Sequence, residues 1–137
     1  NKENIGKHYN KVLKMAVDEK YDTAILMHDD VQMDDFGYTD KLEEAFKEYD
    51  IVGLAGAKQA EMKQPALWHL MSKHEFDENL PAIAHHYDID FCLNANKHKL
   101  KLTTWPIWAI HKSPGLEDPG QDFIDSEKYF LNKWKKT

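Results

Sequence analysis

The stretch that decides the fold is Thr23–Asp30, with the sequence TAILMHDD, in which a short apolar run ends abruptly in polar side chains. A run of this length, bounded by turn residues, favours a buried β-strand. The strand would deliver His28, Asp29 and Asp30 at its carboxyl end. Because ligands of open α/β sheets collect outside the carboxyl ends of the strands, this position is typical of a binding site.

Helical and strand-like patterns alternate on both sides of this predicted strand. Apolar residues at helical spacing predict an amphipathic helix from about 3 to 19 and a second from Thr39, as its N-cap, to Tyr49. This alternation predicts a layered α/β fold, in one domain that covers residues 1–137. The other predicted elements are a buried strand over 51–56, a loop-like segment over 57–80, a helix over 85–98, a strand over 102–111 interrupted by Pro106, a loop over 113–120 and a closing helix over 123–134.

The composition excludes several classes of protein. A formal net charge of -6 argues against binding to nucleic acid or to an anionic membrane, since both need a basic face. The single cysteine, Cys92, excludes an internal disulfide and a cysteine-based zinc site, and it is typical of a reducing compartment. No apolar run is long enough to span a bilayer. We therefore expect a cytoplasmic protein without a transmembrane segment.

Three groups of polar residues could carry chemistry. The carboxylates of Asp29 and Asp30 could hold Mg²⁺ or Mn²⁺, although their spacing alone favours a solvated acidic turn or a helix cap. Asp88, near the start of a predicted helix, would be stabilised as a charged base by the helix dipole, or it simply caps that helix. His111 ends an apolar strand and could bind a metal or a phosphate, or it is a hydrogen-bonded surface residue.

These groups follow one another in an order that resembles the family 2 glycosyltransferases of the GT-A fold. Ile25–Val31 resembles the strand that ends in the DxD-type motif of that family, in a His-Asp-Asp-Val version. Asn4–Gly6 resembles the start of the preceding helix, and Ile51–Lys58 resembles the strand that follows the motif. Tyr87–Leu93 is similar to the acidic helix start that supplies the family's catalytic base. His111–Gly115 is similar to its late histidine segment.

The resemblance implies a fold and a function. The expected fold is a truncated or reduced GT-A sheet, layered with flanking helices, which forms the catalytic half and lacks the opening nucleotide-binding strands. The expected function is metal-dependent, inverting transfer of a sugar from a nucleotide-sugar to an acceptor hydroxyl. The alternative is a non-catalytic GT-A remnant that binds a metal, a nucleotide or a partner chain. Without the opening strand, residues 23–28 would form an open apolar edge, so we also expect a homo-oligomer that covers it.

The resemblance also implies roles for individual residues. His28, Asp29 and Asp30 would contact the cofactor, and His28 stands where the family usually has its first acid. Asp30 and His111 would bind the divalent metal ion, Mn²⁺ or Mg²⁺. Asp88 would be the catalytic base that deprotonates the acceptor.

Overall fold

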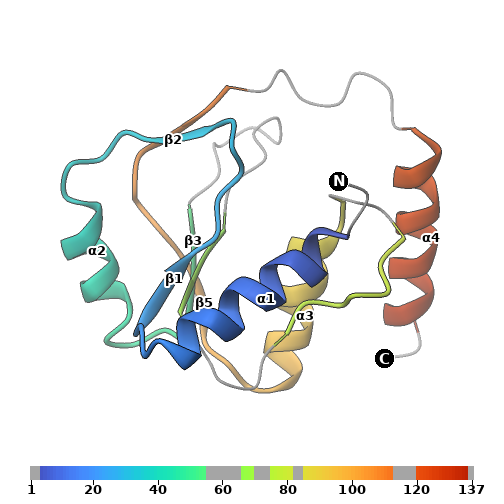
Figure 1. Ribbon diagram of the computed structural model, residues 1–137, viewed down its shortest axis with the longest axis horizontal. Helices are drawn as coiled ribbons and strands as arrows, with labels where there is room; N and C mark the ends of the chain where they lie inside the picture. The colour runs from blue at the N-terminus through green and yellow to red at the C-terminus, as the bar shows by residue number, and fades with distance from the viewer. Residues whose placement is uncertain (1–3, 55–65, 70–74, 82–84, 113–119, 136–137) are drawn as a thin grey trace.

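The computed structural model describes residues 4–54, 66–69, 75–81, 85–112 and 120–135, and their arrangement is drawn in Figure 1. The described part is a mixed α/β fold with a four-stranded sheet and a two-stranded sheet. None of its helices is long and apolar enough to cross a membrane. The elements, in chain order, are α1 (Ile5–Asp18), β1 (Thr23–Ile25), β2 (Val31–Met33), α2 (Tyr38–Ala45), β3 (Ile51–Leu54), β4 (Ala66–His69), α3 (Tyr87–Lys97), β5 (Leu102–Trp105), β6 (Ala109–His111) and α4 (Gln121–Trp134).

The four-stranded sheet is the centre of the fold. Its order is β1-β4-β3-β5, with β3 and β5 parallel and β4 antiparallel to both of its neighbours, so β1, β3 and β5 share one direction. Because side chains alternate along a strand, Ile51 enters one hydrophobic core while Val52 and Leu54 enter another. Figure 1 shows α1 and α3 on one side of the sheet and α2 on the other, so the described elements form three layers.

Helix α1 is fastened to the segment around Phe76 by polar side chains. The side-chain oxygen of Asn4 accepts the Gly6 N–H at 2.7 Å and caps the helix. Asn10 exchanges two hydrogen bonds with the backbone of Phe76, at 2.7 and 2.9 Å. A side chain at Gly6 would crowd this contact, because a Cβ there would lie 3.1 Å from the Phe76 Cβ. These contacts fix α1 against the core.

Two strand predictions are corrected by the structure. The segment 57–80, predicted to be loop-like, contains β4, which lies between β1 and β3. The single strand predicted over 102–111 is wrong, because the chain divides at Pro106 into β5 of the large sheet and β6 of the small sheet. Pro106 has no N–H to donate to a ladder, and the Ile107 N–H turns back to the Trp105 carbonyl at 2.8 Å. This bend redirects the chain from one sheet to the other.

The strand predicted over 23–28 is shorter and less buried than expected. Its ladder covers only the three residues of β1. Ala24 and Leu26 are buried, whereas Ile25 and Met27 are 39% and 40% exposed. The predicted buried strand is therefore buried on one face only, the face that carries Ala24 and Leu26. In the four-stranded sheet of the described residues, β1 is the edge strand.

The remaining predicted elements are present where the chain is described. The helices predicted over 3–19, 85–98 and 123–134 correspond to α1, α3 and α4, with ends shifted by a few residues at most. The predicted loop over 113–120 lies outside the described residues except for its last position. The last two residues of the strand predicted over 51–56 also lie outside them.

Helix α4 is held against α3 by a charge network in the interior. Asp90 is 1% exposed, and its carboxylate accepts hydrogen bonds from Lys133 Nζ and Trp134 Nε1, each at 2.8 Å. Lys133 also donates to Asp77 at 2.6 Å, so one ammonium group joins two carboxylates. Burial alone would raise the pKa of Asp77, but the hydrogen bond from Lys133 helps to hold that pKa below its usual value. Lys133 is therefore the shared cation of two carboxylates that come from different parts of the chain.

We expect Lys133→Met to lower the free energy of unfolding by about 3 kcal/mol, because it leaves the buried carboxylate of Asp90 without its cation. Urea unfolding followed by circular dichroism measures the change. Lys128→Met is the matched control, because Lys128 is an exposed residue of the same helix and should change stability by less than about 0.5 kcal/mol. Equal stability of Lys133→Met and the unmodified chain would show that the network does not hold α4 in place.

Candidate metal centre

A tight turn between β1 and β2 positions the first polar group of the site. The Val31 N–H donates to the His28 carbonyl at 3.2 Å, which closes the turn around Asp30. The Lys112 N–H donates to the Asp30 carbonyl at 2.9 Å, and Val31 lies opposite His111 in the antiparallel ladder of β2 and β6. The small sheet therefore carries His111, which is distant in sequence, to the side of this turn.

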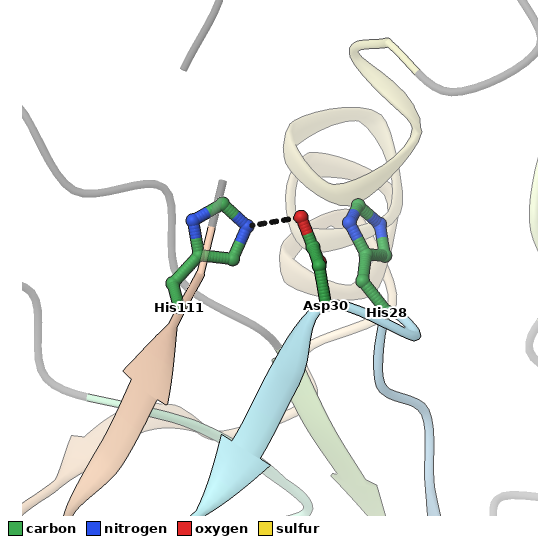
Figure 2. Close-up of side chains that lie close together, drawn as sticks. All are labelled: His28, Asp30 and His111. Carbon is green, nitrogen blue, oxygen red and sulfur yellow. Dashed lines mark ion pairs between the residues drawn. The ribbon is translucent and has the colours of Figure 1, made fainter. Parts of the chain in front are cut away.

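The side chains of His28, Asp30 and His111 converge above the ends of β2 and β6 (Figure 2). One ligand atom from each residue lies within 4.8 Å of the other two. His111 Nε2 is 3.3 Å from Asp30 Oδ2. The other carboxylate oxygen, Asp30 Oδ1, is buried and has no hydrogen-bond partner among the described residues. A buried oxygen without a partner is costly, so a cation at this point would satisfy it.

Two imidazoles and one carboxylate are a donor set suited to a divalent ion. Aspartate oxygens bind Mg²⁺ and Mn²⁺, whereas imidazole nitrogens favour transition-metal ions over Mg²⁺. The combination therefore fits Mn²⁺ better than Mg²⁺, and the same donors hold Zn²⁺ or Fe²⁺ in other proteins. Three protein ligands leave coordination positions open for a substrate.

The far end of β2 is fixed by Asp35. Its Oδ2 accepts hydrogen bonds from Lys41 Nζ at 2.6 Å and from the Trp108 N–H at 3.1 Å. The hydrogen bond from Lys41 holds the pKa of Asp35 below its usual value. Oδ1 accepts the Gly37 N–H at 3.1 Å, and α2 begins directly after Gly37. The prediction of Thr39 as the N-cap is therefore wrong. The N-cap is Gly37, two residues earlier, and its N–H is bound by Asp35.

A tyrosine of α3 contacts the metal group from the core side. The Tyr87 hydroxyl is hydrogen-bonded to Nε2 of His28. Tyr87 in turn is hydrogen-bonded to Tyr9 of α1, and their rings meet edge to face with centroids 5.8 Å apart. Burial raises the pKa of both tyrosines, and nearby carboxylate charges raise it further, so both hydroxyls keep their protons.

The other two predicted site residues lie beside this group rather than in it. Asp29 is exposed on the turn, and its charge is close enough to raise the pKa of Tyr9. Asp88 follows Tyr87 in the first turn of α3 and is half-buried. Its charge raises the pKa of Tyr87, whose hydroxyl contacts His28. Among the described residues no hydrogen-bond donor contacts the Asp88 carboxylate.

Sequence reasoning placed His28 among the cofactor contacts but not among the metal ligands, and it gave Tyr87 and Tyr9 no role. The available signal for His28 was its position two residues before Asp30, which matches the spacing of two acids in a DxD motif. The contact of Tyr87 with His28 joins two elements that no motif connects, so only the fold reveals it. Comparison with family models, with curated proteins and with solved structures found no match to this chain.

Proposed function

We propose that this chain carries the metal-binding and base-bearing residues of a GT-A-type glycosyltransferase of the family 2 kind. The observation that carries the proposal is the grouping of His28 and Asp30 with His111. The resemblance to the family names the turn and the late histidine as one site, and these residues lie together. The strand directions support a binding site at this place, because the turn follows β1 at the end where β3 and β5 also terminate.

The chemistry divides between the metal ligands and Asp88. His28, Asp30 and His111 would hold Mn²⁺ or Mg²⁺, and the bound ion would supply positive charge to neutralise the diphosphate of the nucleotide-sugar. The Asp88 carboxylate takes the proton of the acceptor hydroxyl. The freed oxygen forms a bond to the anomeric carbon while the bond from that carbon to the diphosphate oxygen breaks. The electron pair leaves with the nucleoside diphosphate, and attack from the opposite side inverts the sugar.

Turnover of a nucleotide-sugar tests the proposal. The chain is incubated with a panel of uridine, guanosine and thymidine diphosphate sugars, with and without Mn²⁺. Water or a simple glycoside serves as the acceptor of the sugar, and the released nucleoside diphosphate is measured. We expect release from one donor that depends on Mn²⁺ and stops when EDTA is added. Binding of Mn²⁺ without turnover of any donor would instead support the non-catalytic remnant.

We also propose that the protein is a homo-oligomer that covers β1. Among the described residues no strand pairs with the outer edge of β1. Ile25 of β1 and the nearby Met27 are 39% and 40% exposed. Edge strands of this kind pair with other chains unless a charge, a proline or a bulge blocks them. Neither a charged residue nor a proline occurs between Thr23 and Met27.

We expect sedimentation equilibrium at micromolar concentration to give a dimer or a larger species, and Ile25→Lys to dissociate it, because a lysine on an edge strand opposes pairing. Ile124→Lys on α4 is the matched control, since Ile124 is also partly exposed, at 36%, and lies on another element. A mass of 16.0 kDa for the unmodified chain would rule out the oligomer.

A further inference from the structure

The hydrogen bond between Tyr87 and His28 decides which nitrogen of His28 can bind a metal. Nε2 faces the Tyr87 hydroxyl, so Nδ1 is the only ring nitrogen left for a metal shared with Asp30 and His111. A ligating nitrogen must offer its lone pair, so Nδ1 has to be without a proton. The proton of a neutral imidazole then sits on Nε2, and Nε2 becomes the donor to the tyrosine oxygen.

This arrangement requires the hydroxyl proton of Tyr87 to point elsewhere, and the fold supplies its acceptor. Tyr87 is also in hydrogen-bond contact with Tyr9, and a phenol oxygen can accept a hydroxyl proton. In this arrangement the donors run from His28 through Tyr87 to Tyr9. No proton of this chain lies on His28 Nδ1, so its lone pair is left for a metal.

The ring of Tyr87 is held by packing that does not involve its hydroxyl. It lies at the start of α3, its centroid is 5.8 Å from that of Tyr9 and 6.1 Å from that of Phe76, and it packs against the core that contains Phe91. The hydroxyl is thus presented to His28 from a fixed ring. Second-shell partners of this kind fix both the tautomer and the orientation of a ligating histidine.

We propose that Tyr87 is the positioning residue of the metal centre: its hydroxyl accepts the His28 Nε2 proton and holds Nδ1 toward Asp30 and His111. The proposal rests on the metal centre of the proposed function and not on sugar transfer.

The test is the binding of Co²⁺ and Mn²⁺ to the full chain and to Tyr87→Phe, by isothermal titration calorimetry and by the visible absorption of Co²⁺. Phenylalanine keeps the ring packing with Tyr9 and Phe76 and removes only the hydroxyl. We expect Tyr87→Phe to bind both ions about 10- to 100-fold more weakly, with a changed Co²⁺ spectrum, because His28 loses the partner that orients it. The control Tyr49→Phe removes a hydroxyl from a tyrosine of the opposite core and should leave both readouts unchanged.

A merely structural role for Tyr87 predicts a different outcome. It would lower the melting temperature of Tyr87→Phe but leave the Co²⁺ spectrum and affinity as in the unmodified chain, and this result would overturn the proposal. A second variant keeps the test decisive if Tyr87→Phe folds poorly, because Tyr9→Phe removes the acceptor of the Tyr87 proton while the contact with His28 remains. In that case unchanged affinity and spectrum in Tyr9→Phe would overturn the proposal, and absence of metal binding in the unmodified chain would overturn it together with the metal centre.

Discussion

Replacing Asp30 with alanine is expected to abolish the response of the protein to metal. A ligand that binds only the folded state stabilises it by about 2.7 kcal/mol at a concentration of 100 times its dissociation constant. For a chain of this size, saturating Mn²⁺ should therefore raise the melting temperature by about 10 °C. Asp30→Ala removes the only carboxylate of the three-residue group and should reduce this rise to nearly zero. Thermal unfolding with and without Mn²⁺ measures both values.

The same variant should be no less stable than the unmodified chain when metal is absent. Asp30 Oδ1 is buried and has no partner among the described residues, which costs about 1–3 kcal/mol, whereas the partly exposed pair with His111 contributes at most about 1 kcal/mol. A loss of stability in the metal-free variant would mean that Asp30 serves the fold rather than a cation. Asp34→Ala is the matched control, because Asp34 is an exposed acid at the opposite end of β2 and should keep the full response to Mn²⁺.

The elements that were best predicted from the sequence are those whose own apolar pattern shows which of their faces are buried. Helix α1 shows an amphipathic period because a single face of it packs on the sheet, and its N-cap, Asn4, accepts the Gly6 N–H. Strand β3 reads as a continuous apolar run because Ile51 and Val52 enter cores on opposite faces. β4 could not be predicted, since a four-residue strand gains its stability from β1 and β3 on its two sides rather than from its own sequence.

The candidate site divides in the same way. Asp30 and His111 could be selected because each ends an apolar strand, and position at a strand end is a local property. Their approach to within 3.3 Å depends on the pairing of β2 with β6, which the sequence did not predict because 102–111 read as one strand. The contact of Tyr87 with His28 depends on where the start of α3 lies relative to the turn that follows β1. Local chemistry was therefore predictable, and the partners that tune it were not.

The second large effect is expected for Asp88→Asn, which should lower the rate of nucleotide-sugar turnover by about 10²- to 10⁴-fold. The amide keeps the shape of the side chain but accepts no proton, so deprotonation of the acceptor loses its base. Asp88 lies outside the three-residue metal group, so the affinity for Mn²⁺ should be nearly unchanged. The measurement is nucleoside diphosphate release at saturating Mn²⁺, together with Mn²⁺ titration of the same variant.

The pairing of these two readouts separates a base from a metal ligand. Asp30→Ala should lose metal binding and turnover together, whereas Asp88→Asn should lose turnover alone. Asp122→Asn is the matched control, because Asp122 is likewise an acid in the first turn of a helix, and it tests whether any such carboxylate supports turnover. If Asp88→Asn turns over the donor at the unmodified rate, the Asp88 carboxylate takes no part in transfer. Its role would then be to stabilise the start of α3 through the helix dipole.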